Sequence, residues 1–188
     1  MKNKALFLDR DGVINSDFGY VHKKENFEFL DDIFEIVSEA IRVGFKIFVV
    51  TNQAGIARGY YDEEQFKNLT SWMLEEFEKK GCCIDKVYYS PYHPFKGIGS
   101  YKKDHWSRKP NPGMILQAKD EFNIDLGNSI IIGDNESDMI AGIRAGIANL
   151  ILYTKEPISS ENAKLLKDCI LIKELSIAKE IICRFKDE

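Results

Sequence analysis

Three apolar segments of the sequence are each followed at once by polar side chains that are able to do chemistry. These side chains are Asp9 and Asp11, then Thr51 and Asn52, and then Asp134 and Asp138. An Asp at such a place commonly caps the next turn or helix, and for any one of them alone that role is the simpler interpretation. Their recurrence after three segments favours a shared function, because ligands of open α/β sheets bind beyond the carboxyl ends of the strands.

The types of these residues indicate phosphate chemistry. Asp9, Asp11 and Asp134 offer oxygen ligands without a thiol, which suits a hard cation such as Mg²⁺. Carboxylates that lie close together repel each other and are costly to desolvate unless a cation lies between them. Thr51 and Lys109 add a hydroxyl and an ammonium group, which donate hydrogen bonds to phosphoryl oxygens. Anionic metal ligands beside phosphate donors point to phosphoryl transfer.

The segments between these residues predict strands that alternate with helices. Short apolar runs predict buried strands at residues 5–8, 46–50, 84–89, 129–132 and 149–153. Apolar residues at helical spacing predict helices over residues 33–41, from about 62 to 80, from 112 to about 122, and around 139–145. After about residue 155 we expect a loop, a short strand at 170–172 and a closing helix.

Helix starts are predicted from capping residues. Asp31 or Asp32 can cap the first helix, and Asp62 with Gln65 matches a capping box at the start of the second. Residues 111–112, an Asn followed by a Pro, are predicted as the N-cap and first position of the third helix.

Apolar strands between amphipathic helices predict the α/β class, as a Rossmann-like three-layer parallel sheet with helices on both faces. The length of 188 residues predicts a single domain, residues 1–188. Only about 40 residues separate Asp11 from Thr51, and residues 53–108 hold one core helix, one strand and one loop. Neither insertion is large enough for a separate cap domain.

The composition narrows the classes of partner. With 26 basic and 30 acidic residues the net charge is −4, which gives no broad basic field for nucleic acid. No segment is apolar for long enough to be a signal peptide or to span a membrane. The four cysteines match neither a CxxC pair nor a disulfide framework. We therefore expect a cytoplasmic protein that binds neither nucleic acid nor membrane, and a monomer.

The motifs together resemble the haloacid dehalogenase (HAD) superfamily of aspartyl phosphatases. The resemblance rests on residues 9–12 (DRDG), Thr51, Lys109 and residues 133–138 (GDNESD). Residues 9–15, 51–59 and 108–114 resemble more closely the branch that contains heptose bisphosphate phosphatases and histidinol-phosphate phosphatases, and residues 62–73 favour the heptose enzymes. The resemblance covers about residues 4–154 and leaves 155–188 as a C-terminal extension. The order and spacing of these motifs are far more specific than any single motif.

The resemblance implies a role for each matching residue. Asp9 would be the nucleophile that forms an aspartyl-phosphate, and Asp11 would protonate the leaving oxygen and then deprotonate the attacking water. Mg²⁺ would be held by the Asp9 carboxylate, the Asp11 backbone carbonyl and Asp134, with Asn135 as a further contact through its backbone.

Two other matching residues would hold the phosphoryl group. Thr51 and Lys109 would contact its oxygens, and Lys109 would also offset the charge of the nucleophile. Asp138 would orient its neighbours rather than bind the metal directly.

Without a large cap, loops must select the substrate. The residues predicted to bind it are Asp17, Phe18, Gly19, Tyr20, Thr51, Asn52, Gln53, Ala54, Arg58, Arg108, Lys109 and Asn135. The resemblance implies that residues 17–20 contact the sugar and that Arg108 contacts the substrate. A solvated turn arginine is an equally good interpretation of Arg58.

Residues 90–107 depart from the pattern of these relatives. Many of them bind a structural zinc here through Cys-x-His and Cys-x-Cys pairs, where this chain has Ser-Pro-Tyr at 90–92 and His-Trp-Ser at 105–107. No thiolate remains, and His105 with His93 does not make a closed tetrahedral site, so we expect no structural zinc. We expect aromatic packing to hold the loop instead, through Tyr92, Phe95, Tyr101 and Trp106.

The resemblance thus implies a Mg²⁺-dependent phosphatase that hydrolyses the C7 phosphate of D-glycero-D-manno-heptose 1,7-bisphosphate, a small anionic sugar bisphosphate, on the route to nucleotide-activated heptose for surface glycans. Histidinol-phosphate phosphatase and a 3′-phosphatase of nucleic-acid ends are alternatives, and the acidic balance disfavours the second. An inactive HAD-like binding protein is a third. The retention of Asp9, Asp11, Thr51, Lys109 and Asp134 argues against it, because a binding protein has no chemical need for all five.

Overall fold

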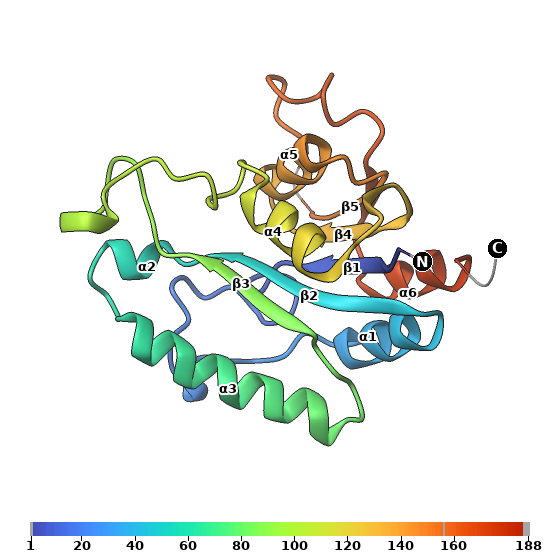
Figure 1. Ribbon diagram of the computed structural model, residues 1–188, viewed down its shortest axis with the longest axis horizontal. Coiled ribbons are helices and arrows are strands. Elements are labelled where there is room, and N and C mark those ends of the chain that lie inside the picture. Colours follow the sequence, from blue (N-terminus) through green and yellow to red (C-terminus); the bar gives the residue numbers. More distant parts are fainter. Residues whose placement is uncertain (1, 156, 186–188) are drawn as a thin grey trace.

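The computed structural model describes residues 2–155 and 157–185. Within these residues, six strands form one parallel sheet in the order β3-β2-β1-β4-β5-β6 (Figure 1). The strands are β1 (Lys4–Leu8), β2 (Phe45–Asn52), β3 (Lys86–Ser90), β4 (Ile130–Gly133), β5 (Asn149–Tyr153) and β6 (Ile170–Ile172). The predicted parallel α/β fold is confirmed.

Helices cover both faces of the sheet. They are α1 (Ile33–Arg42), α2 (Ala54–Ala57), α3 (Glu63–Lys79), α4 (Gly113–Phe122), α5 (Glu136–Ala145) and α6 (Ser176–Cys183), with 3₁₀ turns η1 (Lys24–Asn26), η2 (Gly99–Tyr101) and η3 (Leu126–Asn128). Figure 1 shows α1, α3 and α6 on one face and α4 and α5 on the other. The predicted three-layer arrangement is therefore confirmed, and the sequence did not predict the short helix α2.

Alternate residues of each central strand enter two different cores. Leu6 and Leu8 pack into the core under α1, α3 and α6, whereas Ala5 and Phe7 pack into the core under α4 and α5. All four side chains are completely buried. Because both faces of the sheet are covered, the strands are apolar throughout instead of alternating.

No separate cap domain is inserted in the part of the chain that the structure describes. Residues 12–50 contribute η1, α1 and most of β2, and residues 54–107 contribute α2, α3, β3 and η2. Among the described residues, no helix is long and apolar enough to cross a membrane.

The predicted capping box at the start of α3 is confirmed. The Asp62 side chain accepts a hydrogen bond from the Gln65 backbone, and the Gln65 side chain accepts one from the Asp62 backbone. Asp32 does occupy the N-cap of α1, but it adopts a left-handed conformation (φ 71°) and its side chain makes no capping hydrogen bond. The predicted capping role of the Asp at this helix was therefore wrong.

The predicted start of α4 was also wrong by one position. Pro112, not Asn111, occupies the N-cap, and the helix begins at Gly113. The Asn111 amide donates instead to the backbone carbonyl of His105 at 3.1 Å. Asn111 is thus used to join the preceding loop to the helix, a tertiary contact that outweighs its local capping preference.

Candidate active site

The site lies at the carboxyl ends of three neighbouring strands, where the strand order reverses on either side of β1. Leu8 at the end of β1 pairs with Val49 of β2 and with Ile132 of β4. The Asp9 backbone continues this pairing, since its N–H donates to the Ile132 carbonyl at 3.0 Å. The three polar segments predicted to converge therefore do so at the point of an open α/β sheet where ligands bind.

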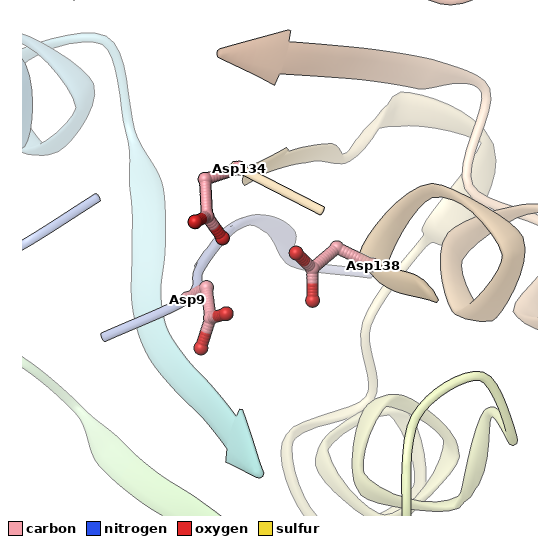
Figure 2. Close-up of side chains that lie close together, drawn as sticks. All are labelled: Asp9, Asp134 and Asp138. Atoms are coloured by element: carbon pink, nitrogen blue, oxygen red, sulfur yellow. The ribbon is translucent and has the colours of Figure 1, made fainter. Parts of the chain in front are cut away.

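Three aspartates gather at this point. Asp9 follows β1, Asp134 follows β4 and Asp138 lies in the first turn of α5 (Figure 2). Each offers a carboxylate oxygen, and these oxygens all lie within 4.8 Å of one another. Among the residues that the structure describes, no other such group of three His, Cys, Asp or Glu residues occurs.

Lys109 is the cation of this cluster. Its Nζ lies 2.9 Å from Asp9 Oδ1 and 2.5 Å from Asp138 Oδ1, and it donates to the Val50 carbonyl at 2.7 Å. The side chain is only 2 % exposed. Burial alone would lower the pKa of Lys109, but the two aspartates outweigh burial and raise that pKa above its ordinary value. Lys109 therefore stays charged.

One lysine does not neutralise three carboxylates. Burial raises the pKa of Asp9 from 3.8 to about 8, with Lys109 opposing the rise and Asp138 and Asp134 adding to it. Burial, followed by repulsion from Asp138, raises the pKa of Asp134 to about 7. The fully ionised cluster has a formal charge of −2, which is the charge that one divalent cation cancels.

The donor set fits Mg²⁺, as the sequence predicted. The oxygens are hard ligands, and no thiol or imidazole competes for the ion within the group of three. Both oxygens of Asp138 are already engaged, Oδ1 by Lys109 and Oδ2 by the Asn135 backbone N–H at 3.1 Å. Asp9 and Asp134 are therefore the carboxylates that would hold the metal, and Asp138 orients Lys109 and the start of α5.

Gly12 leaves the space that Asp134 occupies. A Cβ atom at Gly12 would lie 2.2 Å from Asp134 Oδ2, and the Gly12 backbone has φ 87°, which L side chains rarely adopt. The glycine of the DRDG motif is thus required by a residue 122 positions away in the chain.

The Asp11 carboxylate lies outside the acidic cluster. Arg10 Nη2 lies 2.8 Å from both of its oxygens, Asn15 Nδ2 lies 3.1 Å from Oδ1, and Gln53 Nε2 lies 3.1 Å from Oδ2. The Asp11 side chain is therefore held by Arg10, Asn15 and Gln53 and not by the acidic cluster.

Thr51 and Asn52 lie in the last two positions of β2, not beyond the strand as predicted. Thr51 Oγ1 accepts a hydrogen bond from Gln53 Nε2 at 2.8 Å, so its own O–H is available to donate to a phosphoryl oxygen. The Asn52 amide exchanges two 3.0 Å hydrogen bonds with the backbone of Lys109. Asn52 therefore fixes the segment that brings Lys109 to the acidic cluster.

A cavity of about 680 Å³ opens over the site. It is lined by the predicted residues Asp9, Asp11, Asp17, Gly19, Tyr20, Thr51, Asn52, Gln53, Ala54, Arg58, Arg108, Lys109, Asp134 and Asn135. Phe18 is absent from this lining and is 62 % exposed, so the structure does not bring it into the cavity with the others. The lining also includes Tyr61, His93, Pro110 and Ser137, which were not predicted as site residues.

Arg58, Arg108 and His93 give the cavity wall a second basic group. Arg108 donates to the Tyr92 carbonyl at 3.0 Å, and burial together with the nearby Arg58 lowers its pKa. Burial, followed by Arg108 and Arg58, lowers the pKa of His93. The charges of Arg58 and Arg108 thus act on the same part of the cavity wall as His93.

Residues 90–107 are held by aromatic and hydrogen-bonding contacts. Tyr92 packs on His105 with ring centroids 4.0 Å apart, and it lies 6.1 Å from Tyr101. Ser107 joins the two ends of the loop, because its hydroxyl lies 3.1 Å from Ser90 Oγ and 2.7 Å from His105 Nδ1. Phe95 contributes less than predicted, because its side chain is 80 % exposed and its ring contact is an edge-on one to His93, with centroids 6.4 Å apart.

Sequence reasoning missed Arg10, Asn15 and Tyr61 as parts of the site. Arg10 and Asn15 lie within the motif around Asp11, and Arg10 is 1 % exposed although it stands between two aspartates in the sequence. No local pattern marks Tyr61, whose side chain lines the cavity and whose hydroxyl bonds to Gln53.

Several known proteins are similar to this chain. A family model described as HAD-hydrolase-like matches residues 106–165. The chain is 55% identical over 152 residues to a D-glycero-alpha-D-manno-heptose-1,7-bisphosphate 7-phosphatase of Burkholderia mallei, which covers 81% of this chain and 80% of that protein. It is 46% identical over 166 residues to a D-glycero-beta-D-manno-heptose-1,7-bisphosphate 7-phosphatase of Vibrio cholerae. This match covers 88% of this chain and 89% of that protein.

Solved structures give the same result. A HAD-like phosphatase from Mesorhizobium loti has a TM-score of 0.86 and 33% identity, over 100% of this chain and 89% of that one. The D,D-heptose 1,7-bisphosphate phosphatase of B. bronchiseptica, complexed with magnesium and phosphate, has a TM-score of 0.78 over 96% and 99% of the two chains, and at 23% identity it supports the fold alone. The chain therefore belongs to the HAD-like phosphatases of the heptose-1,7-bisphosphate 7-phosphatase family, and it is a phosphoric monoester hydrolase.

Proposed function

We propose that this enzyme hydrolyses the C7 phosphate of D-glycero-D-manno-heptose 1,7-bisphosphate through an aspartyl-phosphate, with Mg²⁺ as cofactor. The observation that carries the proposal is the position of Asp9 beside the buried Lys109, in an acidic cluster that opens into a cavity with a second basic group. The names of the relatives support the choice of sugar.

In the first step, a carboxylate oxygen of Asp9 attacks phosphorus and the bond from phosphorus to the C7 oxygen breaks. Asp9 Oδ1 accepts from Lys109 Nζ and from the Arg10 backbone N–H at 2.7 Å, which holds the carboxylate in one orientation. Asp11 gives its proton to the departing sugar oxygen. The Thr51 hydroxyl and the Lys109 ammonium donate to the phosphoryl oxygens and stabilise their charge.

In the second step, water attacks the phosphorus of the aspartyl-phosphate. Asp11, now ionised, takes a proton from this water, and the Asp9 carboxylate is released together with inorganic phosphate. Asp9 and Asp134 would hold Mg²⁺, which when bound would supply positive charge against the anionic phosphoryl group.

The second basic group is suited to the phosphate that does not react. A bisphosphate carries two anionic groups, and the acidic cluster with Lys109 accepts only the reacting one. Arg58, Arg108 and His93 offer donors to the other phosphate elsewhere on the cavity wall. We place the product in the supply of nucleotide-activated heptose for surface glycans.

The test is magnesium-dependent release of phosphate from both anomers of heptose 1,7-bisphosphate, with histidinol phosphate as the competing substrate. We expect activity to vanish with a chelator, to return with Mg²⁺ and to be absent in Asp9→Asn. A higher kcat/KM for histidinol phosphate than for heptose 1,7-bisphosphate would overturn the proposed substrate. Equal phosphate release by wild type and Asp9→Asn would overturn the mechanism.

A further inference from the structure

We propose that Tyr61 is a positioning residue for catalysis, whose hydroxyl orients the Gln53 amide so that Gln53 holds Asp11 and Thr51 in place. The inference rests on the proposed function of Asp11 as acid and base. Tyr61 itself lies in the wall of the cavity and is 5 % exposed.

Gln53 links two residues to which the proposed function gives different tasks, Asp11 and Thr51. Its Nε2 donates to Asp11 Oδ2 at 3.1 Å and to Thr51 Oγ1 at 2.8 Å. Gln53 is 1 % exposed, so its amide must find partners inside the protein. One side-chain amide thus sets the distance between the proton-transfer group and the phosphate-binding hydroxyl.

The Tyr61 hydroxyl determines which end of this amide faces Asp11. It donates to Gln53 Oε1 at 2.5 Å. If the amide were rotated by half a turn, Oε1 would face the Asp11 carboxylate and two acceptors would oppose each other. Burial raises the pKa of Tyr61 above its ordinary value, so the hydroxyl keeps its proton and remains a donor.

The Tyr61 ring is held in place by contacts with Gly55 and His22. A Cβ atom at Gly55 would lie 2.1 Å from Tyr61 Cε1, so only glycine leaves room for the ring. The His22 ring also stacks on the Tyr61 ring, with centroids 4.9 Å apart and an interplanar angle of 9°. These contacts fix the hydroxyl in space, which is what a positioning role requires.

The chain contains a matched control. Tyr88 is 4 % exposed, and its hydroxyl donates to Glu121 Oε2 at 2.8 Å. Neither Tyr88 nor Glu121 lines the cavity. Tyr61→Phe and Tyr88→Phe therefore remove the same group from equally buried tyrosines, and only the first acts on the site.

The test compares these variants on heptose 1,7-bisphosphate and on p-nitrophenyl phosphate, whose phenolate leaves without a proton. On the sugar, Tyr61→Phe should lower kcat about 10-fold to 100-fold, part of the 10² to 10⁴ that acid–base catalysis contributes, with KM within about two-fold of wild type. On the aryl phosphate it should release a burst of one p-nitrophenolate per site and then turn over slowly, because the second step still needs Asp11. Tyr88→Phe should match wild type on both substrates.

A double-mutant cycle shows whether Tyr61 acts through Gln53. In a Gln53→Leu background, Tyr61→Phe should have no further effect on kcat. Additive losses, a change in KM alone, or Tyr61→Phe kinetics equal to those of Tyr88→Phe would each overturn the inference. If Tyr61→Phe folds poorly, Gly55→Ala, which displaces the ring but keeps the hydroxyl, should show the same burst. An inactive Asp11→Asn with a fully active Tyr61→Phe refutes this inference alone, whereas an active Asp11→Asn refutes the proposed mechanism.

Discussion

Replacement of Lys109 by methionine should destabilise the metal-free protein by about 3–5 kcal/mol at pH 8, the usual cost of removing one partner from a buried ion pair. Lys109 is 2 % exposed and lies against Asp9, Asp138 and the Val50 carbonyl. Its loss changes the formal charge of the ionised cluster from −2 to −3 and leaves the Val50 carbonyl without this donor. Methionine keeps most of the side-chain volume, so packing contributes little to the expected loss.

The loss should shrink as the pH falls. The folded-state pKa values of Asp9 and Asp134, about 8 and about 7, lie above the ordinary value of 3.8. Between pH 4 and pH 8 the folded state therefore holds more protons than the unfolded state, and the stability of the metal-free protein falls as the pH rises. At pH 5 the carboxyl groups of Asp9 and Asp134 are protonated and uncharged, so the loss of the Lys109 charge costs less stability. Mg²⁺ should restore part of the lost stability at pH 8, because it binds the folded state alone.

Urea denaturation in a chelator, at pH 5 and pH 8, measures this effect. Lys86→Met is the control, since Lys86 forms an exposed pair with Glu121 and exposed pairs contribute about 0–1 kcal/mol. A Lys109→Met variant that loses no more stability than Lys86→Met, or that loses the same amount at both pH values, would refute the account of the acidic cluster.

Three further outcomes follow from the site. Asp9→Asn should reduce kcat to less than about a thousandth of the wild-type value and trap no phosphoenzyme in acid-quenched reactions; a labelled protein band would contradict the nucleophile. Gly12→Ala should weaken Mg²⁺ binding in calorimetry and should destabilise the protein more than Gly81→Ala does. Gly81 has φ 73° and open space around it, so its replacement costs only backbone strain, roughly 1–3 kcal/mol. Equal losses of stability would contradict the clash between a Cβ at position 12 and Asp134. Arg58→Ala should raise KM about 10-fold for heptose 1,7-bisphosphate but not for heptose 7-phosphate, because a lost charge-assisted contact costs about 1.5 kcal/mol; equal effects on both would contradict its role at the second phosphate.

Much of the fold could be predicted because its signals are local. Strands buried on both faces must be apolar throughout, and residues 5–8 and 129–132 show this directly. The capping box of Asp62 and Gln65 is also local, since both partners lie within one turn. Asn111 was misread because its amide reaches the carbonyl of His105, a contact that capping preference does not contain.

The amino-acid sequence by itself determined which groups stand at the ends of the strands, and parallel topology then brings those ends to one edge. That is why Asp9, Thr51 and Asp134 could be placed together before any coordinates were known. Only the tertiary structure decided which of several neighbouring polar atoms bond to which, including the pairing of Lys109 with Asp138 and the chain from Tyr61 to Asp11. The physical reason is that burial patterns repeat along the chain and can be read locally. A hydrogen bond instead requires a donor–acceptor distance correct to a few tenths of an ångström, between residues that are far apart in the sequence.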